Sequence, residues 1–229
     1  MYILALETTG AHASVAIINE EGKITEKSSD SVLNHLQHLM PMTKELLDEA
    51  GLKIGDMTAI AASQGPGSFT GIRIGVSSAR ALAQVTGVET VAVPTLKAFA
   101  YNAPDFEGLI CPVFDARRSQ VFAGAYKWNG GKIEEVVAGA AYALDEFLEK
   151  TVAEGLPRMF FGDGIKAYAD RFTEEETAPE EIRHQMASSV ARLAKDMYEE
   201  GMAVHYEALK PDYMRKAEAE RKLEEKSKK

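Results

Sequence analysis

The stretch Ser63–Gly87, SQGPGSFTGIRIGVSSARALAQVTG, decides how the rest of the chain is interpreted. The apolar run at 57–62 (MTAIAA) precedes it and predicts a buried strand. Gly65-Pro66-Gly67 then predicts a tight turn, and Ser68 is a suitable N-cap for a helix that ends at Gly87. A strand, a glycine turn and a helix N-terminus in this order suit a phosphate or carboxylate ligand. A purely structural turn explains the same residues equally well.

The predicted helix has one face with almost no side chains, because Gly71, Gly75, Ala79 and Ala83 repeat every four residues. Two glycines inside a helix cost about 2 kcal/mol relative to alanine. Close approach of another backbone is the usual physical reason for such a face. The approaching backbone belongs either to the chain's own sheet or to a helix of another subunit.

Composition limits the classes of function. The chain has 229 residues, of which 45% are apolar, and 35 acidic against 26 basic residues give a formal net charge of −9. This acidity disfavours extensive nucleic-acid binding by the chain alone, since phosphate neutralisation requires clustered Lys and Arg. The single cysteine, Cys111, excludes an intrachain disulfide framework. We expect neither a membrane span nor a secretory signal, and therefore a cytoplasmic location.

The first half of the chain predicts a mixed sheet flanked by helices. Three strands form a meander, and helices and strands then alternate. The predicted strands are 2–6, 12–19, 22–28, 57–62 and 90–93, and the predicted helices are 31–50, 68–87 and 94–101.

The second half repeats the first. Residues 4–26 align with residues 112–135: each segment contains a strand that ends in a carboxylate, Glu7 or Asp115, then a second strand and a Gly-Lys-Ile turn. The strand at 159–161 runs into a glycine turn as the strand at 57–62 does. A duplicated unit explains these matches, and it predicts two domains at 1–105 and 106–229 with two acidic corners facing each other across a cleft.

Those corners predict a nucleotide site as one alternative. Glu7 and Asp115 would hold Mg²⁺ through water, and small residues would contact phosphates, as in an ATP-dependent phosphotransferase or ATPase. The other alternative is a duplicated fold that keeps its corner residues after losing the ligand. The candidate cofactor-binding residues are Glu7, Thr8, Thr9, Gly65, Gly67, Ser68 and Asp115.

Three motifs resemble the bacterial TsaB (YeaZ) family. They are LALETT at 4–9, the histidine-containing segment His35-x-x-His38-Leu39-x-Pro41, and GPGSFTGIRIGVSSARALA at 65–83. The segment at 213–220 also looks like the family. The resemblance implies a two-domain actin-like ATPase fold (ASKHA, a duplicated ribonuclease H-like unit). It further implies a partner of TsaD in forming N6-threonylcarbamoyladenosine at adenosine 37 of tRNAs that read ANN codons.

One departure from TsaD-like chains predicts that this chain is not itself catalytic. Those chains carry Asn-His-x-x-x-His after the next strand, and its histidines bind the active-site metal. Here Thr95 and Phe99 take the two histidine positions, and neither replaces an imidazole nitrogen. His35 and His38 lack a third ligand, so we expect no metal site and interpret them as interface residues.

The resemblance also implies the partners. The first two long helices would pack against the equivalent pair of TsaD, with TsaE in the larger complex, tRNA bound through that complex, and a homodimer when TsaD is absent. No cofactor would be tightly bound by this chain, although ATP or ADP with Mg²⁺ would fit the complex interface. The predicted interface residues are His35, Leu36, Leu39, Met40, Leu47, Gly71, Gly75 and Ala79.

Overall fold

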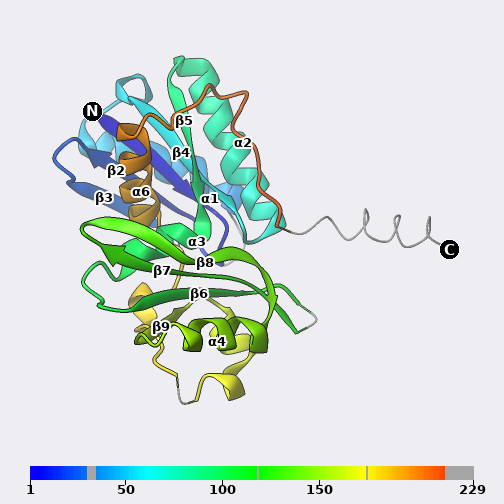
Figure 1. Cartoon of the computed structure of the whole chain (residues 1–229). Helices are drawn as coiled ribbons and strands as arrows, with labels where there is room; N and C mark the ends of the chain where they lie inside the picture. The colour runs from blue at the N-terminus through cyan, green and yellow to red at the C-terminus, as the bar shows by residue number, and fades with distance from the viewer. Residues whose placement is uncertain (30–34, 118, 174, 215–229) are drawn as a thin grey trace.

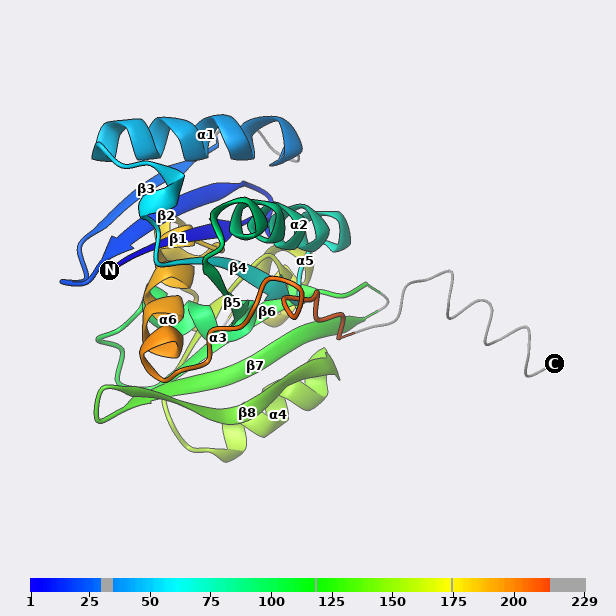
Figure 2. The ribbon, with the colours of Figure 1, turned by 90° about the horizontal axis from the view of Figure 1, so that it is seen from above.

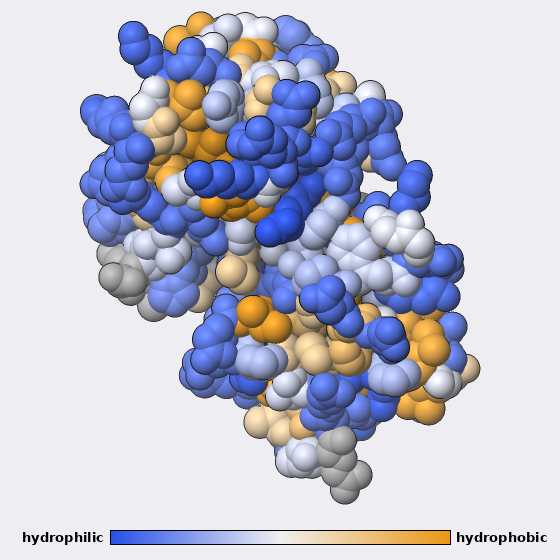
Figure 3. All heavy atoms as spheres, turned by 90° about the vertical axis from the view of Figure 1, so that its left-hand side faces the viewer, coloured by the Kyte–Doolittle hydropathy of each residue, from blue (hydrophilic) through white to orange (hydrophobic). Residues whose placement is uncertain are grey.

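The computed structural model describes residues 1–29, 35–117, 119–173 and 175–214, without the side chains of His35 and Leu36. It contains two mixed β-sheets, one above the other in Figure 1, joined through the segment that follows β5. Seen from another side, the surface shows two lobes that are covered mostly by hydrophilic residues, with separate hydrophobic patches (Figure 3). No helix among the described residues is long and apolar enough to cross a membrane.

The first sheet has the strand order β3-β2-β1-β4-β5. β1 pairs antiparallel with β2 and parallel with β4, so the meander and the later strands share one sheet. Its strands are β1 (Tyr2–Glu7), β2 (Ser14–Asn19), β3 (Ile24–Ser28), β4 (Ala59–Gly65) and β5 (Glu89–Pro94).

Helices cover both faces of the first sheet. α1 (His35–Ala50) and α2 (Phe69–Thr86) pack on one face, over a core that includes Leu6 and Ile60. α6 (Ala187–Glu199) packs on the other face, and Figure 2 shows α1 and α6 on opposite sides of the strands. A short 3₁₀ turn, η1 (Ile54–Asp56), connects α1 to β4.

The second sheet has the strand order β8-β7-β6-β9, and it repeats the order β3-β2-β1-β4 of the first sheet. The duplicated unit is therefore confirmed, and so is the two-sheet α/β fold of the actin-like class. The elements of this part are β6 (Leu109–Asp115), β7 (Gln120–Asn129), β8 (Lys132–Ala143), α4 (Leu144–Ala153), β9 (Arg158–Phe161) and α5 (Gly164–Ala167), followed by the 3₁₀ turns η3 (Ala169–Arg171) and η4 (Glu180–Ile182).

The division into 1–105 and 106–229 differs from the structure at the C-terminus. α6 belongs to the predicted second domain, yet Val190, Leu193 and Ala194 pack into the core of the first sheet. After α6 the chain stays with the first sheet, where Thr90 and Val204 exchange two backbone hydrogen bonds of 2.8 Å. The cause is the second apolar face of the first sheet, which residues 1–105 alone leave largely uncovered.

The two sheets meet at a shared apolar cluster. α3 (Thr95–Ala98) and the 3₁₀ turn η2 (Phe99–Asn102) follow β5 and place Phe99 between them. Its ring centroid lies 5.5 Å from that of Phe114 and 5.8 Å from that of Phe161, which belong to the second sheet. The segment predicted as one helix at 94–101 is thus two short turns that join the sheets.

Candidate functional site

The corner after β1 places Glu7 in the interior. The Glu7 side chain is completely buried, and Oε1 accepts hydrogen bonds from the backbone N (2.5 Å) and Oγ1 (2.6 Å) of Thr9. Ser63 at the end of β4 donates its hydroxyl to Oε2. Burial raises the pKa of Glu7 above its usual value, and these hydrogen bonds offset only part of that rise. The space beside it, next to Thr95, leaves no room for a water molecule.

The glycine face of α2 packs against this corner. Thr8 donates its hydroxyl to the carbonyl oxygen of Gly71 (2.7 Å). A Cβ atom on Gly71 would lie 1.9 Å from the carbonyl oxygen of Thr8, and one on Gly75 would lie 2.5 Å from the Thr8 hydroxyl. The approaching backbone is therefore the chain's own. The predicted partner-interface residues Gly71, Gly75 and Ala79 are corrected to interior residues, since all three are buried.

The glycine turn is filled by other parts of the chain. Ser68 caps α2 as predicted, accepting from the backbone N of Gly71 (3.2 Å), while its own N donates to the carbonyl of Thr9 (2.8 Å). A Cβ on Gly67 would lie 2.6 Å from Cβ of Thr9. The C-terminal segment covers the other side of the turn, where Asp212 N donates to the carbonyl of Gln64 (2.7 Å).

The phosphate-binding interpretation of this region is corrected accordingly. It needs an open cradle with free N–H groups and an available carboxylate. In the structure the hydroxyls of Thr8 and Thr9 and both oxygens of Glu7 already have protein partners, and the three side chains are buried. Gly65, Gly67 and Ser68 pack against neighbouring backbone, so the turn has a structural role.

Asp115 is held within its own half of the molecule. Its Oδ1 accepts from the backbone N of Arg117 (2.8 Å) and from the hydroxyl of Tyr168 (3.1 Å), and its N donates to Asp163 (3.1 Å). Burial raises the pKa of Asp163, and the neighbouring Asp115 carboxylate adds to the rise. The sequence predicted that Glu7 and Asp115 hold one Mg²⁺ together. In the structure each carboxylate is hydrogen-bonded within its own half, Glu7 to Thr9 and Ser63 and Asp115 to Arg117 and Tyr168.

The two positions matched to metal ligands lie in the interior. Thr95 and Phe99 are each 1% exposed, and Phe99 belongs to the aromatic cluster between the sheets. The hydroxyl of Thr95 is a buried polar atom without a hydrogen-bond partner in the described parts of the chain. Those parts also contain no group of three or more His, Cys, Asp or Glu residues that could hold a metal ion.

The outer faces of α1 and α2 differ from the predicted partner interface. Leu39 and Leu47 are core residues, whereas Met40 is 38% exposed, and the side chains of His35 and Leu36 lie outside the described residues. On α2 the exposed residues include Ser77, Ala81 and Val85, which follow one another at intervals of four. The signal that could have found them is the helical period, since this row lies opposite the row of Gly71, Gly75 and Ala79.

A further exposed group lies at the start of α2. The rings of Phe69 and Tyr213 lie 4.8 Å apart, and Arg73 Nε donates to the hydroxyl of Tyr213 (2.9 Å) while its guanidinium lies 4.0 Å from the Phe69 ring centre. These contacts fix the C-terminal segment to α2. Of the segment 213–220, which resembles the family, the structure describes only Tyr213 and Met214, and the rest lies outside the described residues.

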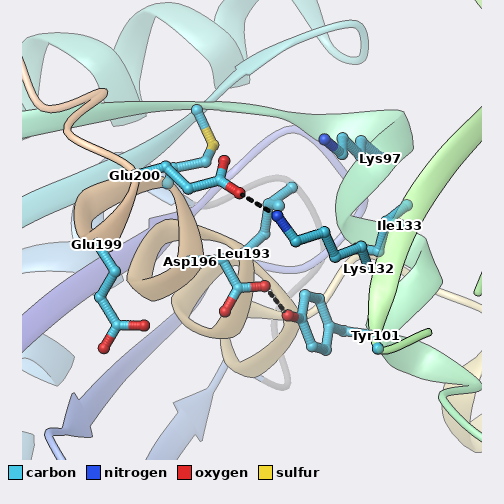
Figure 4. Close-up of a pocket in the computed structure, with 10 residues that line it drawn as sticks. Lys97, Tyr101, Lys132, Ile133, Leu193, Asp196, Glu199 and Glu200 are labelled. Atoms are coloured by element: carbon cyan, nitrogen blue, oxygen red, sulfur yellow. Dashed lines mark hydrogen bonds and ion pairs between the residues drawn. The ribbon is translucent and has the colours of Figure 1, made fainter. Parts of the chain in front are cut away.

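A polar cavity of about 340 Å³ lies where α3, α6 and the β7–β8 turn meet (Figure 4). Three of its five charged side chains, Lys132, Asp196 and Glu200, have a partner within the lining. Tyr101 donates its hydroxyl to Asp196, and Lys132 Nζ lies 3.8 Å from Glu200. These two contacts connect α6 and the residue that follows it to η2 and to the β7–β8 turn.

Comparison with known proteins agrees with this fold. The family model described as TsaD, tRNA N6-adenosine threonylcarbamoyltransferase, matches residues 28–223. The tRNA threonylcarbamoyladenosine biosynthesis protein TsaB of Bacillus subtilis is 34% identical over 97% of both chains, and that of Escherichia coli is 29% identical over 97% of this chain and 98% of its own. The solved structure of YeaZ from Pseudomonas aeruginosa superposes with a TM-score of 0.81 at 28% identity, covering 93% of this chain and 99% of that one.

Proposed function

The chain belongs to the TsaB (YeaZ) family of tRNA threonylcarbamoyladenosine biosynthesis proteins, and from this premise we propose that it is the non-catalytic, activating partner of a TsaD-type transferase. In this role it supplies a folded binding surface, and TsaD carries out the transfer of the threonylcarbamoyl group to adenosine in tRNA.

One observation carries the non-catalytic part of the proposal. The two positions that match metal-binding histidines are Thr95 and Phe99, and Phe99 contacts two other aromatic rings in the cluster that joins the sheets. A metal at this position would need imidazole or carboxylate ligands in place of an aromatic ring and a hydroxyl. Side-chain packing thus occupies the place where the family's transferase has its chemistry.

The proposed partner surface is the outer face of α1 and α2. Both helices cover the same face of the first sheet, and Figure 2 shows them on the same side of the strands. Ser77 and Ala81 are small and exposed, which lets another helix approach α2 closely. Met40 on α1 and Val85 on α2 are exposed apolar side chains that would add apolar contacts.

The remaining partners follow from the same proposal. TsaE joins the larger complex, tRNA is bound through the complex, and the same surface pairs with a second copy when TsaD is absent. The net charge of −9 supports indirect tRNA contact, because an acidic surface repels phosphate. The proposal includes ATP or ADP with Mg²⁺ as a ligand of the complex interface and the cytoplasm as the site of action. An ATP-dependent phosphotransferase acting alone is disfavoured, since Glu7 has no free oxygen for a hydrated Mg²⁺.

The test combines assembly with activity. The purified chain is mixed with TsaD from the same source and analysed by size-exclusion chromatography with light scattering. We expect a stable complex, and transfer of the threonylcarbamoyl group to tRNA that neither protein catalyses alone. Failure to form a complex, or full activity of TsaD without this chain, would reject the proposed role.

A single substitution locates the interface. Ala81→Arg places a long charged side chain on the exposed face of α2, and we expect at least a tenfold weaker complex with an unchanged melting temperature. Ala138→Arg is the matched control, since Ala138 is exposed on β8 of the second sheet. Equal affinity of the two variants for TsaD would place the interface elsewhere.

A further inference from the structure

We propose that a groove on the second lobe binds a basic, apolar peptide segment of a partner protein, with an Arg or Lys side chain beside an aliphatic one. The groove has a volume of about 650 Å³ and lies between the segment 104–108, the end of β7 and the loop after α4. It belongs to the second sheet, whereas α1 and α2 cover the first. The proposal is thus independent of the surface assigned to TsaD.

Two aromatic side chains form rigid walls of this groove. Trp128 donates its indole N–H to the carbonyl oxygen of Ala100 (3.0 Å), and its ring packs edge-on against Tyr101 at 4.9 Å. Phe106 folds back over Gly108, where a Cβ atom would lie 2.7 Å from its ring. Because both rings are held by the protein, a ligand would meet preformed walls and lose little affinity to ordering them.

The apolar surface continues beyond these rings. Leu156, in the loop after α4, is 39% exposed and lines the same groove. Phe106 and Trp128 are only partly buried, since each packs against the cluster between the sheets with one side. A partner that covers Leu156 and the free sides of the two rings would gain hydrophobic free energy.

The charges at the rim decide what kind of partner fits. Asp105 and Glu107 are exposed, and neither has an ion pair or hydrogen bond among the described residues. The cation at the rim, Lys127, already lies 3.5 Å from Glu134. The groove therefore presents two unneutralised carboxylates next to aromatic rings.

A guanidinium or ammonium group satisfies both features, since it pairs with carboxylates and is attracted to the face of an aromatic ring. Nucleic acid fits poorly, because its phosphates would face Asp105 and Glu107. An aliphatic neighbour of the cation would cover Leu156. Together these requirements describe a short peptide segment that alternates Arg or Lys with Leu-like residues.

Trp128 makes the proposal directly measurable, because it is the chain's single tryptophan. The full chain is titrated with the peptide N-acetyl-Arg-Leu-Arg-Leu-amide while the fluorescence of Trp128 is recorded. We expect a saturable change in emission, and we expect the affinity for the peptide to fall when salt is added. The acidic twin N-acetyl-Glu-Leu-Glu-Leu-amide should give none.

Charge-reversal variants distinguish peptide binding in this groove from non-specific attraction of a basic peptide to an acidic protein. The double substitution Asp105→Lys and Glu107→Lys should lower the affinity for the arginine peptide at least tenfold. The matched control, Glu89→Lys with Glu149→Lys, makes the same change in net charge at exposed positions on β5 and α4, away from the residues that line the groove, and should leave the affinity within twofold. Leu156→Ser should weaken binding while all variants keep the wild-type melting temperature.

Three results would overturn the proposal. They are no change in emission with the arginine peptide, equal weakening by both charge-reversal pairs, or a saturable response to an RNA oligonucleotide in place of the peptide.

Discussion

Gly71 and Gly75 lie where α2 crosses the corner after β1, and the space at each position belongs to Thr8. In an open helix, replacing glycine by alanine stabilises by about 1 kcal/mol. Here the new methyl group would overlap Thr8, its carbonyl oxygen at Gly71 and its hydroxyl at Gly75, so the same replacement forces the helix away from the sheet. The Gly71/Gly75 row thus serves the fold of the first lobe.

We therefore expect Gly71→Ala to lower the free energy of unfolding by about 2 kcal/mol or more, as overpacked core sites do. Gly55→Ala is the control, since a Cβ atom there meets nothing within 4 Å. Urea unfolding of both variants provides the measurement. Similar stability of the two variants would mean that α2 can shift freely away from Thr8.

Glu7 gives the protein a predictable dependence on pH. Its pKa in the folded state lies above the usual value of 4.5 because of burial. The folded protein consequently binds this proton more tightly than the unfolded chain, and the contribution of Glu7 to stability falls as pH rises from 4.5 through the folded-state pKa.

Glu7→Gln removes this titration. The amide oxygen can still accept from Thr9, and the amide N–H can donate to the Ser63 hydroxyl. We expect the free energy of unfolding of the wild type, relative to Glu7→Gln, to decrease between pH 4.5 and neutral pH. Urea unfolding at several pH values measures this difference; a difference that stays constant or grows with pH would contradict the raised pKa.

Among the elements, α6 shows how side chains on distant strands can accept the hydrogen bonds of a helix N-terminus. Its N-cap residue, Met186, makes no side-chain cap, so the first N–H groups of the helix need other acceptors. Ala187 N donates to Ser14 Oγ (3.0 Å) on β2, and Ser188 N donates to Glu26 Oε1 (2.9 Å) on β3. The sheet thus supplies the cap, and a carboxylate there also suits the positive end of the helix dipole.

Glu26→Ala should therefore lower the free energy of unfolding by about 1 kcal/mol, the usual cost of a lost cap. Glu26→Gln keeps an oxygen acceptor and should lose less. Hydrogen exchange of the α6 amides, measured beside urea unfolding, should speed up most in the first turn. Unchanged exchange in Glu26→Ala would show that water replaces this cap without cost.

At the scale of the whole molecule, the two lobes are not two contiguous segments. The first lobe needs α6, which packs on the face of its sheet that contains Ile3, Ile18 and Val91. A chain that ends at residue 105 exposes this apolar face. Such a fragment lacks one of the two layers of helices around its sheet.

We expect the fragment 1–105 to aggregate or to lack cooperative unfolding, whereas the chain 1–214 unfolds cooperatively. Circular dichroism during heating and light scattering make the comparison. A soluble fragment 1–105 with a sharp unfolding transition would show that α6 is dispensable for the first lobe.

The local sequence determined the elements and their repetition. Continuous apolar runs, the Ser68 cap and the stop at Gly87 act through near neighbours, so they predict β1, β4 and α2 well. The repeat of Leu4–Glu26 in the second half predicted a duplicated unit, because both copies carry the same pattern, and the structure shows the same strand order in both sheets.

The tertiary structure decided which surfaces are free. The spacing of Gly71 and Gly75 in the sequence suits a partner helix and the chain's own Thr8 equally. Only the position of β1, which places Thr8 against both glycines, decides between these alternatives. The corner residues Glu7 and Thr8 likewise suit a phosphate site until Ser63 and Gly71 occupy their polar atoms. Burial depends on contacts between residues far apart in the chain. The groove between Phe106, Trp128 and Leu156 likewise forms only because folding brings three distant segments together.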